Sequence, residues 1–119
     1  MRPMNIVSTT IVLDAPDLEA ESSFWAAMYD GTVERDVDWH SVIVDGRSTL
    51  GIQLAPDHLP PEWPAGEQQQ QIHLDLHVPD IASASRLGAR VLQKADFGQA
   101  SGFVVYADPA GHPFCLCWG

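Results

Sequence analysis

A nine-residue segment occurs twice in this chain and constrains its fold more than any other feature. Residues 10–18 (TIVLDAPDL) align with residues 73–81 (HLDLHVPDI), with apolar residues at matching positions and Pro-Asp followed by Leu or Ile at the end of each copy. A repeat of this kind indicates an architecture built from two copies of one structural unit. Each copy has the pattern of a strand that leads into a helix.

A helical pattern follows each copy. After the first copy, Asp17 is a suitable N-cap, Glu19 and Glu21 suit the positive end of the helix, and Gly31 is expected to end it in a left-handed conformation. The second helix is expected from Asp80 to Leu87, before Gly88. It is therefore the shorter of the two, with about two turns.

Three strand patterns follow each helix, so the order β-α-β-β-β is expected twice in an α+β fold. Asp45-Gly46 and the segment 108–111 (DPAG) are turn signals between the last two strands of each half. The expected strands are residues 32–36, 40–44 and 49–55 in the first half and 90–94, 103–107 and 114–118 in the second.

A chain of 119 residues has the usual length of one domain. Neither half alone is long enough to bury a core, so one domain is expected over residues 1–119. Module one is expected at about residues 5–55 and module two at about 71–119. A proline- and glutamine-rich linker or flap at about 56–70 joins them.

Residues 71–78 (QIHLDLHV) alternate between polar and apolar side chains. This period of two predicts a strand with an apolar face under the helix and a polar face on the other side. The polar face contains His73 and Asp75, and the last strand adds Cys115 and Cys117 to the polar set. These residue types are more typical of a pocket lining than of a solvated face, which is usually rich in Lys and Glu.

The chain resembles the vicinal-oxygen-chelate superfamily, which includes glyoxalase I, bleomycin resistance proteins and extradiol dioxygenases, and in particular its glyoxalase-like branch. The resemblance covers nearly the whole chain. It implies two tandem βαβββ modules that form a curved eight-stranded cup around a pocket, with helices outside. The segments that carry it are QIHLDLHVPD (71–80), LGARVL (87–92), DPAGHPFCL (108–116) and the loop PEWP (61–64).

The resemblance also implies four metal-ligand positions, which are Thr10, Gln53, His73 and Cys115 in this chain. Only His73 is a ligand of the usual type, Gln53 offers a carbonyl oxygen, and Cys115 offers a thiolate that suits zinc. Because a catalytic divalent ion needs three good protein ligands, we expect no bound cofactor. If a divalent metal binds, His73, Gln53 and Cys115 are the candidates.

The candidate ligand-binding residues are Thr10, Gln53, Trp63, His73, Asp75 and Cys115, and each has a structural alternative. His73 either binds a ligand or moves a proton, or it is a hydrogen-bonded histidine of the sheet. Asp75 either orients His73 or accepts a substrate proton, or it pairs with a polar group of a neighbouring strand. Cys115 is expected to be an inert, half-buried thiol because no cation is near it in sequence. Trp63 either faces a ligand from the flap or fills a pocket mouth or a dimer interface.

A net charge of −10 makes nucleic acid and anionic membranes poor partners. No apolar run is long enough to span a bilayer, no signal peptide is recognised, and the two cysteines fit a reducing cytoplasm. Since modules of this kind leave sheet edges that need cover, a homodimer is expected.

Three functions remain open for the chain. The first is a metal-free protein that binds a small, partly apolar molecule in the cup. The second is a glyoxalase-like lyase, isomerase or dioxygenase with a reduced metal site that uses His73. The third is a non-catalytic interaction module. Thr10 stands where a metal-dependent enzyme would have a stronger ligand, which favours the metal-free binding protein over the enzyme. The polar, histidine-containing face of the sheet disfavours the interaction module.

Overall fold

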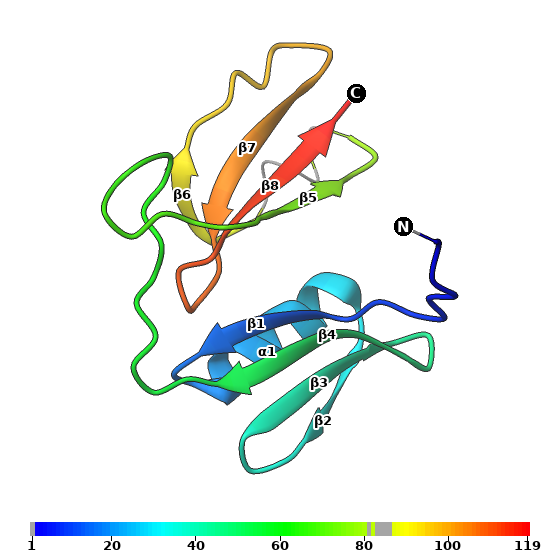
Figure 1. Ribbon diagram of the computed structural model, residues 1–119. Helices are drawn as coiled ribbons and strands as arrows, with labels where there is room; N and C mark the ends of the chain where they lie inside the picture. Colours follow the sequence, from blue (N-terminus) through cyan, green and yellow to red (C-terminus); the bar gives the residue numbers. More distant parts are fainter. Residues whose placement is uncertain (1, 81, 83–86) are drawn as a thin grey trace. The chain divides into compact units, whose positions relative to one another are not determined.

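The computed structural model describes residues 2–80, 82 and 87–119 (Figure 1). The chain forms two compact units, residues 1–58 and residues 59–119. Each unit contains one four-stranded sheet. The division at residue 58 assigns most of the expected linker, residues 59–70, to the second unit.

The first unit is a complete βαβββ module. It consists of β1 (Ile11–Ala15), α1 (Leu18–Tyr29), β2 (Thr32–Arg35), β3 (Trp39–Val44) and β4 (Arg47–Leu54). The strand order is β1-β4-β3-β2, in which β1 runs parallel to β4 and the other neighbours are antiparallel. The β3–β4 turn contains Asp45 and Gly46, both with positive φ angles of 51° and 75°, so the hairpin prediction is confirmed.

Local signals set the start and the end of α1. The Asp17 side chain accepts a hydrogen bond from the Ala20 amide at 3.0 Å, as predicted for the N-cap. The prediction for Gly31 is wrong, because Asp30 is the left-handed residue, with φ 53° and ψ 45°. Gly31 is needed for a different reason, since a Cβ atom there would collide with the carbonyl oxygen of Ile43.

The core of the first unit lies between α1 and one face of its sheet. Trp25 is 1% exposed on the helix, and Leu50 and Ile52 are 1% and 0% exposed on β4. The helix contacts β3, β2 and β4 (Figure 1). Ser22 Oγ and His40 Nδ1, both buried, form a hydrogen bond of 2.8 Å that joins the helix to β3. Among the described residues of the first unit, α1 is the one helix, and it covers one face of this sheet.

The second unit repeats the strand arrangement of the first. It contains β5 (Leu74–His77), β6 (Arg90–Gln93), β7 (Gly102–Ala107) and β8 (Pro113–Trp118), in the order β5-β8-β7-β6 with β5 parallel to β8. The Gly111 amide donates to the Asp108 carbonyl at 2.9 Å, which confirms the predicted turn. The expected helix between Asp80 and Leu87 falls largely on residues 81 and 83–86, outside the described residues.

The prediction of an α+β fold with two tandem βαβββ modules is confirmed. The observed strand ends differ from the predicted ones by three residues at most, with the largest difference at the start of β5. Among the described residues, no helix has both the length and the apolar character that a membrane span requires. The cup, and the single domain over residues 1–119, depend on how the two sheets are placed and stay predictions.

Candidate functional site

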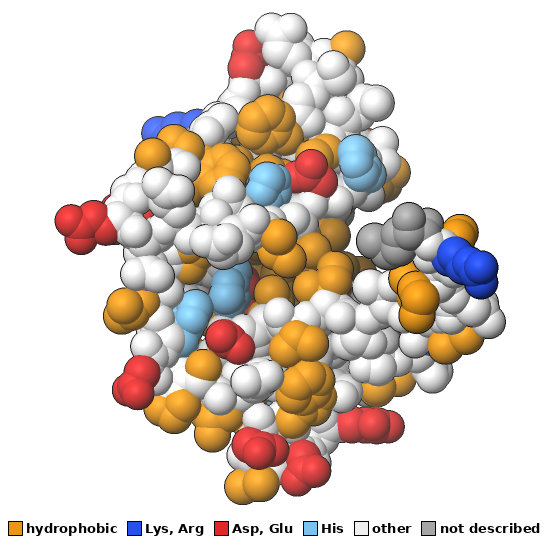
Figure 2. Space-filling model, viewed as in Figure 1, with side chains coloured by type: hydrophobic (Ala, Val, Ile, Leu, Met, Phe, Trp, Pro, Cys, Tyr) orange, Lys and Arg blue, Asp and Glu red, His pale blue; other side chains and the backbone are white. Residues whose placement is uncertain are grey.

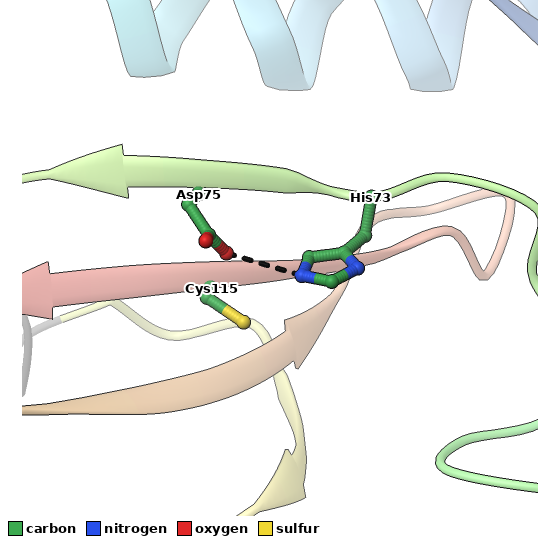
Figure 3. A group of neighbouring side chains, drawn as sticks. All are labelled: His73, Asp75 and Cys115. Carbon is green, nitrogen blue, oxygen red and sulfur yellow. Dashed lines mark ion pairs between the residues drawn. The ribbon is translucent and has the colours of Figure 1, made fainter.

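Three predicted site residues lie together at the β5–β8 pair of the second unit (Figure 3). Asp75 of β5 is the direct partner of Cys115 of β8 in the parallel register. His73 precedes β5 by one residue, so it points to the same side as Asp75 by the two-residue period of a strand. The burial pattern supports this reading, because His73 and Asp75 are exposed and Leu74 and Leu76 are half-buried.

Each ring nitrogen of His73 lies within hydrogen-bonding distance of a side-chain oxygen. Its Nε2 atom lies 3.1 Å from Asp75 Oδ1, and its Nδ1 atom lies 3.2 Å from Gln70 Oε1. The two contacts fix the orientation of the imidazole ring above the strand. The predicted role of Asp75 in orienting His73 fits this geometry, and Gln70 is an additional partner that the sequence did not indicate.

The thiol of Cys115 is buried, with 3% of the residue exposed. Burial raises its pKa to about 12, and the carboxylate of Asp75 beside it acts in the same direction. Burial also raises the pKa of the Cys117 thiol. Because the thiolate is the nucleophilic form, neither cysteine is activated for covalent chemistry. This agrees with the expectation of an inert thiol at Cys115.

Trp63 reaches His73 from the loop before β5. The two rings meet edge to face, with centroids 5.5 Å apart and planes at 84°. The indole N–H of Trp63 donates a hydrogen bond of 3.1 Å to Gln93 Oε1. The indole is therefore held at two points, and it places a half-buried aromatic surface beside the His73–Asp75 pair.

A straight row of residues crosses the second sheet on this side. Strand register aligns Gln93 of β6 with Val105 of β7, Val105 with Cys115 of β8, and Cys115 with Asp75 of β5. Gln93 belongs to the site through this row and through Trp63. Sequence reasoning missed it, because a register shift between Val91 and Gln93 sets its position, and no local pattern signals that shift.

Thr10 and Gln53 belong to the first unit. Both are exposed, Thr10 immediately before β1 and Gln53 near the end of β4. The register pairs Ile11 with Leu50 in the first unit and Leu74 with Phe114 in the second. Gly51 is therefore the repeat equivalent of Cys115, and Gln53 is that of Cys117. The ligand-binding roles of Thr10 and Gln53 stay predictions.

The surface over the second sheet contains mixed chemistry. Figure 2 shows histidine, acidic and hydrophobic side chains next to one another over β5 and β8, and few Lys or Arg side chains on this face. The chain contains only six Lys and Arg residues against sixteen Asp and Glu residues. Such a surface attracts positively charged groups and repels anions.

One imidazole nitrogen, one carboxylate oxygen and one thiol sulfur of this cluster lie within 4.8 Å of one another. They come from His73, Asp75 and Cys115. Two of the three candidate metal ligands, His73 and Cys115, are therefore in this cluster, and Asp75 takes the place of Gln53. Nitrogen, oxygen and sulfur donors together fit a borderline divalent ion such as zinc. The residues of the second unit alone can thus supply three donors.

Comparisons with known proteins agree with the fold. The family model described as a glyoxalase-like domain matches residues 10–117. No curated protein matches the sequence at a significant level.

Solved structures with the same fold are similar over nearly the full length of the chain. The fosfomycin resistance protein FosX from Listeria monocytogenes has a TM-score of 0.66 at 13% identity and covers 98% of this chain and 95% of its own. A glyoxalase/dioxygenase from Nostoc punctiforme has a TM-score of 0.66 at 18% identity, with 99% and 94% covered. A bleomycin-binding protein complexed with bleomycin has a TM-score of 0.60 at 16% identity, with 96% and 99% covered.

Proposed function

This chain belongs to the glyoxalase-like domain family, and we propose that it binds a small, partly apolar molecule through the side chains around His73. The observation that carries the proposal is the contact of Trp63 with His73, which sets an aromatic ring beside the His73–Asp75 pair. Small-molecule sites combine apolar walls with a few oriented polar groups. Thr10 and Gln53 are the proposed contacts from the first module.

The electrostatics of the site favour a neutral or cationic ligand. Asp75 presents a carboxylate that is 55% exposed and lies beside the imidazole of His73. The Trp63 ring adds a negative π face that attracts a cation. The similar bleomycin-binding protein, which is complexed with bleomycin, supports small-molecule binding as the function.

Three probes with the same ring test the proposal. Benzylamine, benzyl alcohol and benzoate differ in charge, and saturation-transfer NMR compares their binding. We expect the strongest signal for benzylamine and the weakest for benzoate. Trp63→Ala should weaken benzylamine binding by about 2- to 10-fold, the equivalent of one lost aromatic contact. Asp75→Asn should remove the preference for the cation. Bleomycin serves as a larger probe in the same comparison.

His77→Ala is the matched control, because His77 is the next exposed side chain on the same face of β5. It should leave all three signals unchanged. Equal binding of the three probes, or signals that neither Trp63→Ala nor Asp75→Asn alters, would contradict the proposal.

A metal-dependent lyase, isomerase or dioxygenase is the second candidate. The grouping of His73, Asp75 and Cys115 within 4.8 Å favours it. In that case these residues hold a divalent ion that supplies Lewis-acid chemistry. Turnover that requires added metal and is lost in His73→Ala would support the enzyme over the binding protein.

We also propose a homodimer and a cytoplasmic location. Each sheet has two edge strands, β1 and β2 in the first unit and β5 and β6 in the second. Edges of this kind need cover, and a second copy can provide it. Both cysteines are free, which suits a reducing compartment. Light scattering coupled to size exclusion tests the dimer, because a mass of one chain would contradict it.

A further inference from the structure

We infer that His73, Asp75 and Cys115 form a zinc site contained entirely within the second module. This ligand set differs from the one expected from the resemblance, because it draws nothing from Thr10 or Gln53. Its third donor is Asp75, which stands on the same strand as His73. The inference does not depend on the binding of an organic ligand.

The positions of the three donor groups follow from the backbone. Residues two apart on a strand point the same way, which brings His73 and Asp75 together, and direct pairing in the register brings Cys115 to Asp75. The three donor atoms lie within 4.8 Å of one another. Donors around a tetrahedral zinc ion are about 3.3–3.7 Å apart, as bond lengths of about 2.0–2.3 Å require. Zinc binding would therefore need side-chain rotations that close this difference.

The hydrogen bonds of His73 fit a metal ligand. With Gln70 Oε1 at 3.2 Å from Nδ1 and Asp75 Oδ1 at 3.1 Å from Nε2, both nitrogens face acceptor oxygens. A neutral imidazole has one N–H, so only one of these contacts can be a hydrogen bond. If Nδ1–H donates to Gln70, the Nε2 lone pair and the Asp75 oxygen both face the space where a cation would lie. An outer partner that fixes the histidine in this way is usual in zinc sites.

The charges of the cluster also fit a divalent ion. A Cys115 thiolate and the Asp75 carboxylate together carry two negative charges, which one Zn²⁺ ion neutralises. Zinc binding would release the proton of the thiol, as it does at other thiolate sites.

The donor types select the metal. A thiolate disfavours magnesium and calcium, which prefer oxygen ligands. One nitrogen, one oxygen and one sulfur donor suit zinc and leave a fourth position open, as in catalytic zinc sites. The Trp63 ring meets the His73 ring edge to face and so borders the site on the His73 side. The open position would accept water or an oxygen atom of a small ligand.

Cobalt(II) in place of zinc reports the ligands directly. Titration of the full chain with Co²⁺ should give one equivalent of bound metal, a thiolate-to-cobalt charge-transfer band, and visible bands of four-coordinate intensity. Added Zn²⁺ should displace the cobalt. His73→Ala and Asp75→Asn change exposed side chains, so both variants should fold and lose the stoichiometric binding. Gln70→Ala should weaken zinc by about 10- to 100-fold, as loss of an outer partner does.

The neighbouring side chains on the same two strands are matched controls. Cys115→Ser should abolish the charge-transfer band, whereas Cys117→Ser and His77→Ala should retain it. If Cys115→Ser fails to fold, X-ray absorption of zinc-loaded Cys117→Ser gives the same answer, because Cys115 is then the only cysteine of the chain and its sulfur should lie about 2.3 Å from the zinc.

Three results would overturn the inference: no metal bound at equimolar micromolar concentrations, a charge-transfer band that survives the loss of Cys115, or full affinity in Asp75→Asn. If no metal binds, the His73–Asp75 contact is explained in one of two other ways. Either a protonated imidazole forms an ion pair with Asp75, or a neutral imidazole donates from Nε2 to Asp75 and accepts at Nδ1 from the amide NH2 of a Gln70 side chain turned by 180°. Binding of organic probes that persists in the absence of metal would leave the proposed function standing, so the two failures are distinguishable.

Discussion

The contact between Gly51 and Trp39 predicts that Gly51→Ala destabilises the wild-type protein but not the Trp39→Ala variant. Gly51 is buried in β4, and the Trp39 indole lies directly over it. A Cβ atom at Gly51 would be 2.8 Å from Trp39 Cη2 and 3.0 Å from Cε2, with Cζ2 closer still. Carbon atoms prefer about 3.5–4.0 Å. Gly51→Ala therefore requires the indole to move away from the sheet.

The size of the effect follows from three contributions. Overpacking of this kind destabilises by about 1–3 kcal/mol. Movement of the ring also weakens the 3.0 Å hydrogen bond from Trp39 Nε1 to Ser41 Oγ, which is worth about 0.5–1.5 kcal/mol. In the opposite direction, alanine in a strand interior is about 0.5–1 kcal/mol more favourable than glycine. We expect Gly51→Ala to lower the free energy of unfolding by about 1–3 kcal/mol.

A double-mutant cycle isolates the role of the indole. In Trp39→Ala the obstacle is gone, so adding Gly51→Ala should be neutral or should stabilise by about 0.5–1 kcal/mol. Urea unfolding of the four proteins, with far-UV circular dichroism as the signal, measures the coupling between the two sites. If Gly51→Ala destabilises equally in both backgrounds, the indole is not the cause and the reasoning is refuted.

Two further predictions concern buried groups. At pH 9 the Cys115 thiol, with its pKa raised to about 12, should react with iodoacetamide roughly 100- to 1,000-fold more slowly than in the urea-unfolded chain. Asp75→Asn should speed the reaction of the folded chain. Peptide mass analysis measures both rates, and equal rates in the native and unfolded chains would contradict the prediction. Ser22→Ala leaves His40 without its 2.8 Å partner and should cost about 1–3 kcal/mol in urea unfolding, whereas the exposed Ser23→Ala should change it by less than about 0.5 kcal/mol. Similar losses for the two serines would contradict the assigned hydrogen bond.

The fold was predictable from the sequence because its main signals are local. The repeated Pro-Asp segment, the Asp17 cap and the Asp45-Gly46 turn each act within a few residues, and the structure confirms the cap and the turn. The exception in this group is the end of α1. Glycine is the usual left-handed residue, but Gly31 is needed for its close approach to Ile43, twelve positions further along the chain, and Asp30 takes the left-handed conformation instead.

The site was only partly predictable, because its contacts depend on strand register. Alternation along β5 placed His73 and Asp75 on one face, and that grouping is observed. The pairing of Asp75 with Cys115 joins residues forty positions apart. The contact of Trp63 with Gln93 joins residues thirty positions apart. No periodicity within a single strand encodes such distances along the chain.

Register also explains why the two modules differ in chemistry, and it predicts a stoichiometry. The repeat equivalents of His73, Asp75 and Cys115 are Thr10, Val12 and Gly51, since β1 pairs with β4 as β5 pairs with β8. Threonine is a poor ligand when neutral, and valine and glycine have no donor side chain. A cysteine at Gly51 would also collide with Trp39, because the indole ring occupies the space that the side chain would need. The first module therefore has no means to build the same site, and the proposed zinc should bind once per chain; two equivalent sites in the cobalt titration would show that register does not separate the modules in this way.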